Sequence, residues 1–305
     1  MFEVINSSRK ILIDRLRSEP TESEWGPSPV ELWKSKTNSP WEGDLSNFRR
    51  LRISSGTINP PDRPSDISQE PYPDENFVAR IYNTLRLLMN LSRLEVHCLI
   101  WNQSFFKYVC QFNSKKFRKF SILNNYFNDI SIRMSYYSHR IRKINFDKPI
   151  IMEIGSGYGA LSSCLKGNYS KFIIVDLIEN LILASEFLNE SGINFGTISD
   201  LSNNNVSVLL LSGGDMRSVD KVDIVVNTMS MQHMTNENLN YYFREIERLH
   251  PKYIYLVNRN IKRDLTDVEI QNYPIPSRYT PKKSNPIYSN NYTEILLACT
   301  DCASV

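Results

Sequence analysis

The second half of the chain alternates short apolar runs with amphipathic stretches. The runs are rich in Ile, Val and Leu, are apolar at nearly every position, and cover residues 149–155, 172–177, 206–212, 223–229, 253–258 and 294–300. Strands that are buried on both faces have this composition, as in a parallel sheet covered by helices. Helical spacing of apolar residues predicts helices over 178–190, which ends at Ser191-Gly192, and over 236–249, which ends before Pro251. The alternation predicts a doubly wound, Rossmann-like α/β sheet.

The first 145 residues follow a different pattern. Residues 17–75 hold many prolines and three of the four tryptophans, Trp25, Trp33 and Trp41, which predicts an irregular segment whose rings pack on the body of the protein. From Asp74 to residue 142, apolar residues recur at helical spacing. We therefore expect two regions: 1–145, an irregular and mainly helical cap that contributes to substrate binding, and 146–305, the sheet domain.

Composition and charge exclude several classes of protein. Hydrophobic residues make up 41% and charged residues 23% of the chain, as in globular proteins, and the net charge of +3 is too small to indicate nucleic-acid binding. No apolar run approaches the roughly 20 residues of a membrane span, and the start lacks the apolar core of a signal peptide. The five cysteines, typical of reduced thiols, are Cys98, Cys110, Cys164, Cys299 and Cys302. We expect a cytoplasmic protein.

The sharpest motif is a glycine turn where the first predicted strand gives way to a helix, Glu153-Ile154-Gly155-Ser156-Gly157-Tyr158-Gly159. Its third glycine follows the second by two positions, whereas the dinucleotide-binding fingerprint requires three. Glu153 would repel a pyrophosphate and suits a ligand with a cationic amino-acid end. The expected ligand contacts of this turn are Glu153, Gly155, Ser156, Gly157 and Gly159.

Acidic residues follow the next two strands. Asp176, with Leu177 beside it, closes the second strand, where a carboxylate can accept hydrogen bonds from both hydroxyls of a ribose. Asp215 and Met216 follow the third strand within Gly213-Gly214-Asp215-Met216, where they could read an adenine edge and flank its ring. Two structural alternatives stay open: Asp176 could cap the helix that follows it, and Gly-Gly-Asp is ordinary turn chemistry.

In this order, the motifs resemble those of class I S-adenosylmethionine-dependent methyltransferases. The resemblance covers residues 145–300 and includes the glycine turn, Asp176, Gly214-Asp215-Met216 and the strand 223–227. It implies S-adenosylmethionine as cofactor, Asn227 among the residues that bind it, and a final strand hairpin around 273–300.

A narrower likeness lies in residues 227–234, Asn-Thr-Met-Ser-Met-Gln-His-Met, which is similar to the N-T-x-S-M-Q-x-M stretch of bacterial sugar O-methyltransferases of polysaccharide biosynthesis. Ser39-Pro40-Trp41 and Asn258-Arg259 also fit that family. The likeness implies a cytoplasmic enzyme of glycan assembly, with a free, nucleotide-linked or polymeric sugar as acceptor. The basic run 114–143 is interpreted as a solvated helix face, with an anionic glycan or a membrane surface as the alternative and RNA as the third choice.

A sugar hydroxyl is a weak nucleophile, so its methylation requires a general base. Of the four histidines, His233 follows the fourth strand on the crevice side and is the candidate base, with a packing or helix-capping role as the alternative. The candidate substrate-binding residues are Gln232, Asn258, Arg259 and Tyr279. No pair of carboxylates follows the fourth strand, and Cys299 and Cys302 form a solitary pair, so we expect no metal.

Two other functions stay open at this point. A methyltransferase acting on nitrogen in RNA or protein would be supported by an Asn/Asp-Pro-Pro-aromatic element after the fourth strand, where this chain has Asn227-Thr228-Met229-Ser230. A non-catalytic scaffold that retains the fold predicts a broken glycine turn, and here Glu153, the glycines and Asp176 are present.

Overall fold

The computed structural model describes residues 129–144, 146–261, 268–287 and 292–301, together with residues 8, 10–12, 14–15, 22–23 and 26–27. Within the proline- and tryptophan-rich stretch it describes one small antiparallel pair, β1 (Glu22–Ser23) and β2 (Gly26–Pro27). The other predictions for residues 16–128, including the three tryptophans, Ser39-Pro40-Trp41, Cys98 and Cys110, lie outside the described residues, as does Cys302.

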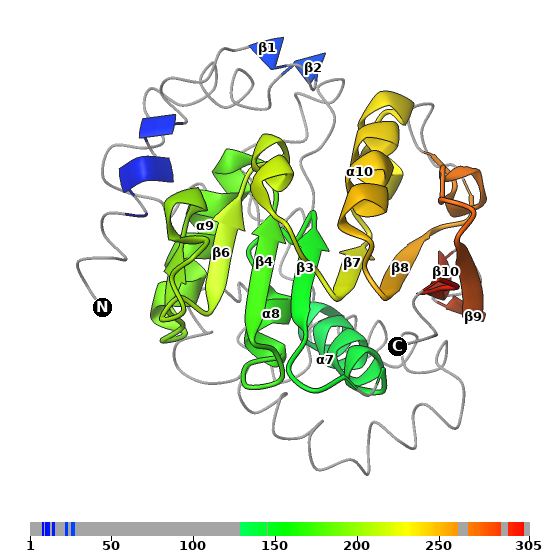
Figure 1. Ribbon diagram of the computed structural model, residues 1–305, viewed down its shortest axis with the longest axis horizontal. Coiled ribbons are helices and arrows are strands. Elements are labelled where there is room, and N and C mark those ends of the chain that lie inside the picture. Colours follow the sequence, from blue (N-terminus) through cyan, green and yellow to red (C-terminus); the bar gives the residue numbers. More distant parts are fainter. Residues whose placement is uncertain are drawn as a thin grey trace, which may run out of the picture.

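An eight-stranded sheet forms the centre of the described chain, in the order β5-β6-β4-β3-β7-β8-β10-β9 (Figure 1). The strands are β3 (Ile150–Ile154), β4 (Lys171–Val175), β5 (Phe195–Gly196), β6 (Val208–Leu211), β7 (Ile224–Thr228), β8 (Tyr253–Arg259), β9 (Tyr279–Ile287) and β10 (Tyr292–Cys299). Every pairing from β5 to β8 is parallel. The six predicted strands and the Rossmann-like sheet are confirmed.

The last two strands form an antiparallel hairpin at one end of the sheet. β10 pairs with β8 from Tyr292 opposite Arg259 to Ala298 opposite Tyr253, and on its other side it pairs with β9. β9 is the last strand of the described sheet and contains Pro281 and Pro286, which have no backbone N–H to donate. These prolines obscured its strand pattern in the sequence.

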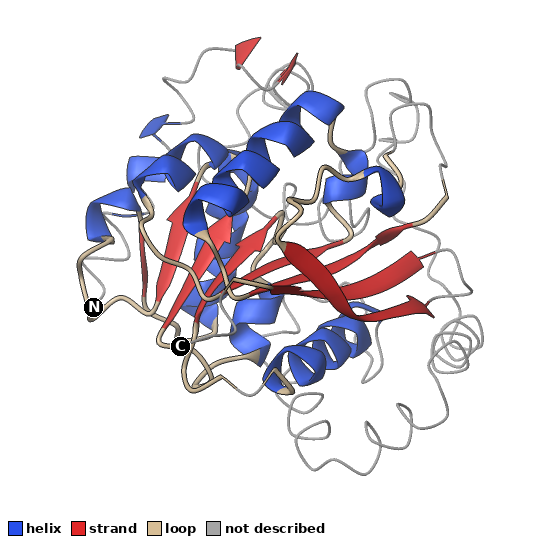
Figure 2. Cartoon of the chain, turned by 45° about the vertical axis from the view of Figure 1, so that its right-hand side comes forward, coloured by secondary structure: helices blue, strands red, loops and turns tan. Residues whose placement is uncertain are grey.

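Helices cover both faces of the sheet (Figure 2). α7 (Asp129–Arg142), α8 (Ala160–Cys164) and α9 (Ile178–Glu190) belong to one layer, and α10 (Asn236–Leu249) belongs to the other. Along β3 the pleat alternates between the layers, since Ile151 packs with the first and Met152 with the second. The helices predicted over 178–190 and 236–249 are confirmed. Across the described residues, no helix combines the length and the apolar character that crossing a bilayer requires.

A buried carboxylate, Glu294 of β10, fixes α7 on the sheet. Glu294 is 1% exposed and accepts hydrogen bonds from Tyr136 Oη at 3.0 Å, Tyr255 Oη at 2.9 Å and Arg140 Nε at 2.6 Å. Because Tyr136 and Arg140 lie on α7 and Tyr255 lies on β8, the carboxylate joins three elements. α7 therefore packs into the same core as the sheet, although it precedes residue 146, and the division into two regions stays a prediction.

Replacing Glu294 by Ala should lower the free energy of unfolding by about 3–5 kcal/mol, because it leaves a largely buried guanidinium without its charge partner. The side chain of Arg140 is only 10% exposed. Urea denaturation followed by circular dichroism measures the effect. Asp220→Asn removes the same charge from an exposed position and should change stability by less than about 0.5 kcal/mol. Equal effects of the two substitutions would show that the Glu294 cluster does not fix α7.

Candidate functional site

The six parallel strands, β3 to β8, end at one edge of the sheet, which we call the carboxyl edge (Figure 1). From β3 the chain winds through β4 to β6 on one side and then returns to β7 and β8 on the other. β3 and β7 therefore form the switch point, where sheets of this type bind their ligands. The glycine turn, Asp176, Asp215 and residues 229–233 all follow strand ends at this edge.

The glycine turn leaves β3 with three positive φ angles, 72° at Gly155, 62° at Gly157 and 79° at Gly159. A Cβ atom at Gly155 would lie 1.9 Å from Ser230 Oγ, and one at Gly159 would lie 2.9 Å from Ile174 Cδ1. A Cβ atom at Gly157 would meet no atom within 4 Å. Gly155 and Gly159 therefore permit close packing, whereas Gly157 borders open space that a ligand could use.

Asp176 ties this turn to the start of α9. Asp176 is 9% exposed, and its Oδ2 accepts a hydrogen bond from the Gly157 N–H at 2.7 Å. Oδ1 accepts from the Leu177 N–H at 2.7 Å and from Asn180 Nδ2 at 2.6 Å. Leu177 is the N-cap of α9 and the helix has no side-chain cap, so Asp176 joins the glycine turn to the start of α9 without capping the helix. The binding of ribose by the same carboxylate stays a prediction.

Glu153 and Ser156 carry buried polar atoms at the same turn. Within the described chain, neither Glu153 Oε2 nor Ser156 Oγ has a hydrogen-bond partner. Burial of the carboxyl group, together with the negative charge of Asp176, raises the pKa of Glu153 to about 8. Buried polar atoms without partners are costly, so these two atoms mark a position that a ligand with complementary groups would complete.

Asp215 is held by the turn that follows β6. Ser212 precedes a short 3-10 helix, η4 (Gly213–Ser218), and Asp215 Oδ2 accepts from Ser212 N at 2.8 Å and from Ser212 Oγ at 2.9 Å. Arg15 Nη1, from the N-terminal stretch, donates to the same oxygen at 2.7 Å. Within the described residues Oδ1 has no hydrogen bond, so it is the oxygen left for a ligand.

The large apolar side chains that are exposed in the described chain both lie beside the carboxyl edge. Leu177, 41% exposed, follows β4, and Ile261, 42% exposed, follows β8. Leu177 lies next to Asp176, where a flat apolar ring of a ligand could cover it.

A buried amide framework joins the ends of β3, β7 and β8. Asn227 Nδ2 donates to the carbonyl of Ile154 at 2.7 Å and to Ser230 Oγ at 2.5 Å. Asn227 Oδ1 accepts from Asn258 Nδ2 at 2.8 Å and from the backbone N–H of Met231 at 3.3 Å. Both donors and both acceptor positions of the Asn227 amide are therefore used within the chain.

Four residues that the sequence assigned to ligand binding are placed in the interior. Met216, Asn227 and Asn258 are 0% exposed, and Gln232 is 1% exposed. Met216 packs in the core with α10, and the amides of the other three are bonded to the chain. These four side chains lie in the interior behind the carboxyl edge, and their binding of a ligand stays a prediction.

His233 lies exposed at this edge, and Gln232 is one of its hydrogen-bond partners. Gln232 Oε1 accepts from the Arg259 N–H at 3.0 Å, which directs the amide nitrogen Nε2 to His233 Nε2 at 3.1 Å. Because an amide nitrogen only donates, His233 Nε2 accepts and the neutral ring carries its proton on Nδ1. His233 can act as a base through Nε2 only after this hydrogen bond is released.

The chain just before His233 has a strained backbone. Met229 follows β7 with a φ of 61°, a conformation that is rare outside glycine. The Met229 N–H donates to the carbonyl of Val257 at 2.7 Å, and the turn brings Ser230 Oγ to 3.1 Å from the carbonyl of Ile154. Such strain costs about 1–3 kcal/mol and persists where surrounding hydrogen bonds impose it.

Arg259 and Tyr292 form a pair where β8 and β10 meet the carboxyl edge. Arg259 Nε donates to Tyr292 Oη at 3.2 Å, and the guanidinium carbon lies 5.9 Å from the centre of the Tyr292 ring. The sequence singled out Arg259 but missed Tyr292, because the antiparallel register that places them opposite each other has no local signal. The structure also adds Arg15, Asn180 and Ser230 to the residues of this edge.

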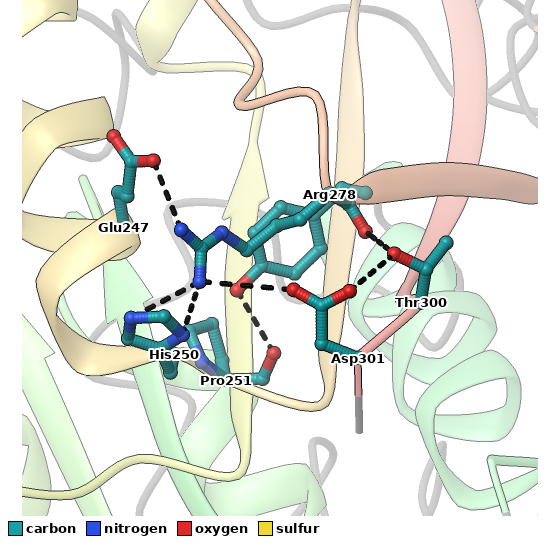
Figure 3. Close-up of polar contacts among 7 residues, drawn as sticks. Glu247, His250, Pro251, Arg278, Thr300 and Asp301 are labelled. Carbon is teal, nitrogen blue, oxygen red and sulfur yellow. Dashed lines mark hydrogen bonds and ion pairs between the residues drawn. The ribbon is translucent and has the colours of Figure 1, made fainter. Parts of the chain in front are cut away.

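Tyr279 lies at the opposite edge of the sheet. β8 and β9 are both antiparallel to β10, so β9 begins where β8 begins, away from the carboxyl edge. Tyr279 is 5% exposed and its Oη donates to the carbonyl of Pro251 at 3.0 Å. Figure 3 shows the surrounding cluster, in which Arg278 contacts His250 and Glu247. The prediction that Tyr279 binds the substrate does not fit this position.

The described residues contain no group of three His, Cys, Asp or Glu side chains arranged to hold a metal ion. Cys164 and Cys299 are buried free thiols that lie in different helical layers of the core.

The chain matches no protein-family model and no curated protein. Solved structures of similar fold include the methyltransferase domain of bacterial CtHen1-CN, at 13% identity over 56% of this chain and 100% of that chain, with a TM-score of 0.41. The PH0226 protein of Pyrococcus horikoshii OT3 is 13% identical over 57% of this chain and 92% of that chain, with a TM-score of 0.41. The magnesium protoporphyrin IX methyltransferase of Synechocystis PCC 6803 with bound SAH is 11% identical over 63% of this chain and 97% of that chain, with a TM-score of 0.40. Identities of 11–13% and TM-scores of 0.40 and 0.41 say nothing about the reaction of this chain.

The two central glycines of the turn should respond differently to substitution. Gly157→Ala should leave the protein folded and lower the free energy of unfolding by about 1–2 kcal/mol, because only the positive φ is unfavourable. Gly155→Ala should destabilise the protein much more, since its Cβ would lie 2.4 Å from Ser230 Cβ, and Ser230→Gly should recover part of the loss. Urea denaturation compares the four proteins. Equal losses at the two glycines would contradict the open space at Gly157.

The Glu153 carboxyl should make folding sensitive to pH. In the unfolded chain its pKa is 4.5 and in the folded chain about 8, so the folded state binds an extra proton between these values. The contribution of this group to stability is therefore complete below pH 4.5 and decreases as the pH rises to about 8, by about 3–5 kcal/mol.

Glu153→Gln should remove this part of the pH dependence and be more stable than the wild-type protein at pH 8. Denaturation at several pH values measures the difference, with Glu237→Gln, which changes an exposed carboxylate, as the control. Parallel stability curves for Glu153→Gln and the wild type would show that Glu153 is ionised in the folded protein.

Proposed function

We propose that this protein is an S-adenosylmethionine-dependent methyltransferase. The observation that supports the proposal is a set of polar atoms and open space along the carboxyl edge: Glu153 Oε2, Ser156 Oγ and the space at Gly157 beside the switch point, and Asp215 Oδ1 after β6. Together they offer acceptors and room at the strand ends where sheets of this type bind ligands.

The chemistry of these positions fits the parts of S-adenosylmethionine. The ammonium group at the amino-acid end of the cofactor is a suitable partner for the buried Glu153. Ser156 Oγ can donate a hydrogen bond to the carboxylate at the same end of the cofactor. The carboxylate of Asp176 would hold the ribose hydroxyls, with Leu177 against the adenine ring. Asp215 Oδ1 would accept a hydrogen bond from the adenine amino group.

When bound, S-adenosylmethionine would supply a methyl group carried on a cationic sulfur for transfer to the acceptor oxygen, with the uncharged thioether as the leaving group. The tasks of this chain are to position the acceptor in line, to exclude water and to remove the hydroxyl proton. We assign the proton to His233 Nε2, which becomes available when the acceptor hydroxyl replaces Gln232 as its hydrogen-bond partner.

We further propose a sugar or glycan hydroxyl as the acceptor. This rests on the likeness of residues 227–234 to sugar O-methyltransferases and on the presence of Arg259 and Tyr292 near His233 in the same framework. Guanidinium and phenol groups suit the hydroxyls of a sugar and the phosphates of a nucleotide-linked one.

The alternative that a specific observation favours is a binding scaffold without transfer activity, because His233 Nε2 is engaged by Gln232. Such a protein would bind the cofactor but would not move the methyl group. Methylation of nitrogen in RNA or protein has no observation of its own in the site.

Calorimetry with S-adenosylhomocysteine tests cofactor binding. The wild-type protein should bind it, and the affinity should increase as the pH is raised to about 8, because Glu153 must lose its proton to pair with the ammonium group. Glu153→Gln should bind more weakly at every pH and lose this dependence. Absence of binding to the wild-type protein would overturn the proposed function.

Transfer of labelled methyl groups to nucleotide sugars and glycan fragments tests the catalytic assignment. His233→Ala should lower the rate by about 10²–10⁴-fold, while its affinity for S-adenosylhomocysteine stays unchanged. His250→Ala removes an imidazole from the opposite edge of the sheet and should keep the wild-type rate. Binding without transfer in the wild-type protein, over the whole acceptor panel, would favour the scaffold.

A further inference from the structure

Arg15 connects the N-terminal stretch with the turn after β6, 200 positions further along the chain. Arg15 Nη1 donates to Asp215 Oδ2 at 2.7 Å and Nη2 donates to Ser212 Oγ at 3.1 Å. Ser212 Oγ in turn donates to Asp215 Oδ2 at 2.9 Å. The planar guanidinium thus binds both members of the turn, a geometry that a lysine cannot reproduce.

The stretch that carries Arg15 is anchored in the core. Leu12 is 0% exposed and belongs to the same apolar cluster as the buried residues of α9, and Ser8 is 1% exposed. Residues 8, 10–12 and 14–15 are helical, with Lys10 and Asp14 on the exposed side. Arg15 is therefore held in place by packing of its own segment and not only by its ion pair.

The contacts of Arg15 determine which oxygen of Asp215 a ligand can reach. Three donors, Ser212 N, Ser212 Oγ and Arg15 Nη1, converge on Oδ2. Charge-assisted hydrogen bonds of this kind prevent the carboxylate from rotating. Within the described residues Oδ1 keeps its acceptor positions, so a group that binds there must be a donor.

We propose that Arg15 is a positioning residue for base recognition, which holds Asp215 so that Oδ1 accepts a hydrogen bond from the 6-amino group of adenine. The inference rests on the proposed function, since it takes the adenosyl part of the cofactor as the ligand. Hypoxanthine carries an oxygen in place of this amino group and would face Oδ1 with a second acceptor. Arg15 therefore contributes to the choice between the two bases although it acts through Asp215.

Isothermal titration calorimetry with S-adenosylhomocysteine and S-inosylhomocysteine tests this inference. The wild-type protein should bind the adenosyl compound more tightly. Arg15→Gln should weaken its binding by about tenfold and reduce the preference by a similar factor, because Asp215 Oδ2 then loses its charged donor and keeps only its two hydrogen bonds to Ser212. Arg15→Lys should restore part of the preference, since an ammonium group can reach Oδ2 but cannot also hold Ser212.

The double variant Arg15→Gln/Asp215→Asn separates positioning from a general structural effect. If Arg15 acts through Asp215, the double variant should show the same preference as Asp215→Asn alone. Lys10→Gln, which removes a charge from the exposed side of the same stretch, should behave as the wild type. Thermal unfolding of each ligand-free variant shows whether the fold is retained.

An unchanged preference in Arg15→Gln, or a further loss when it is added to Asp215→Asn, would overturn the positioning role while cofactor binding by the wild type stands. If the wild-type protein binds neither compound, the proposed function fails, and this inference fails with it.

Discussion

The geometry of the candidate site depends on one side chain that continues the sheet where its backbone pairing stops. The ladder between β3 and β7 runs from Ile151 opposite Ile224 to Glu153 opposite Val226. One residue further, Asn227 Nδ2 binds the carbonyl of Ile154, and Ser230 Oγ binds the same carbonyl. These bonds hold the strand ends together at the switch point, and they bring Ser230 against Gly155, so the path of the glycine turn depends on them.

The same edge contains groups that do not favour folding. Glu153 is fully buried beside a second carboxylate, and Met229 is held in a strained conformation. Neither feature would be favoured in a sequence selected only for stability. Local conflicts of this kind concentrate at functional sites, where a ligand resolves them on binding. The buried carboxyl of Glu153 and the strained backbone of Met229 therefore indicate a functional site at this edge, as its shape does.

The sequence predicted the fold well because periodicity reports burial directly. Six strands, β3, β4, β6, β7, β8 and β10, and the helices α9 and α10 follow from apolar patterns, whereas β5 has only two residues and prolines obscured β9. Because parallel strands all end at the same edge of a sheet, the sequence also predicts that Glu153, Gly157, Asp176 and Asp215 lie at one edge. Side-chain direction does not follow in this way. Asn227 and Asn258 lie near strand ends, yet their side-chain amides turn inward and bind each other, and Asn258 Oδ1 also accepts from the backbone N–H of Gln232. These bonds depend on distances between strands that are far apart in the sequence.

Tyr279 and Arg15 are two further residues whose positions the sequence did not predict. Tyr279 was assigned to the crevice because it follows the fifth predicted strand, but the hairpin reverses the chain and places the start of β9 at the other edge. Arg15 had no signal at all, because one arginine in an amphipathic stretch is ordinary and its partner is 200 residues away. The pattern of residues along the chain does not reveal long-range pairings of this type.

The composition of β9 bears on how the molecule behaves beside copies of itself. The strand closes the described sheet with Pro281 and Pro286 in its backbone and with Lys282 and Lys283 exposed. A neighbouring strand that approached this border would find missing donors and a pair of positive charges. Natural sheets protect unpaired borders in this way against edge-to-edge aggregation. The hairpin thus adds two strands to the sheet, and its outer strand opposes the pairing of a further strand from another molecule.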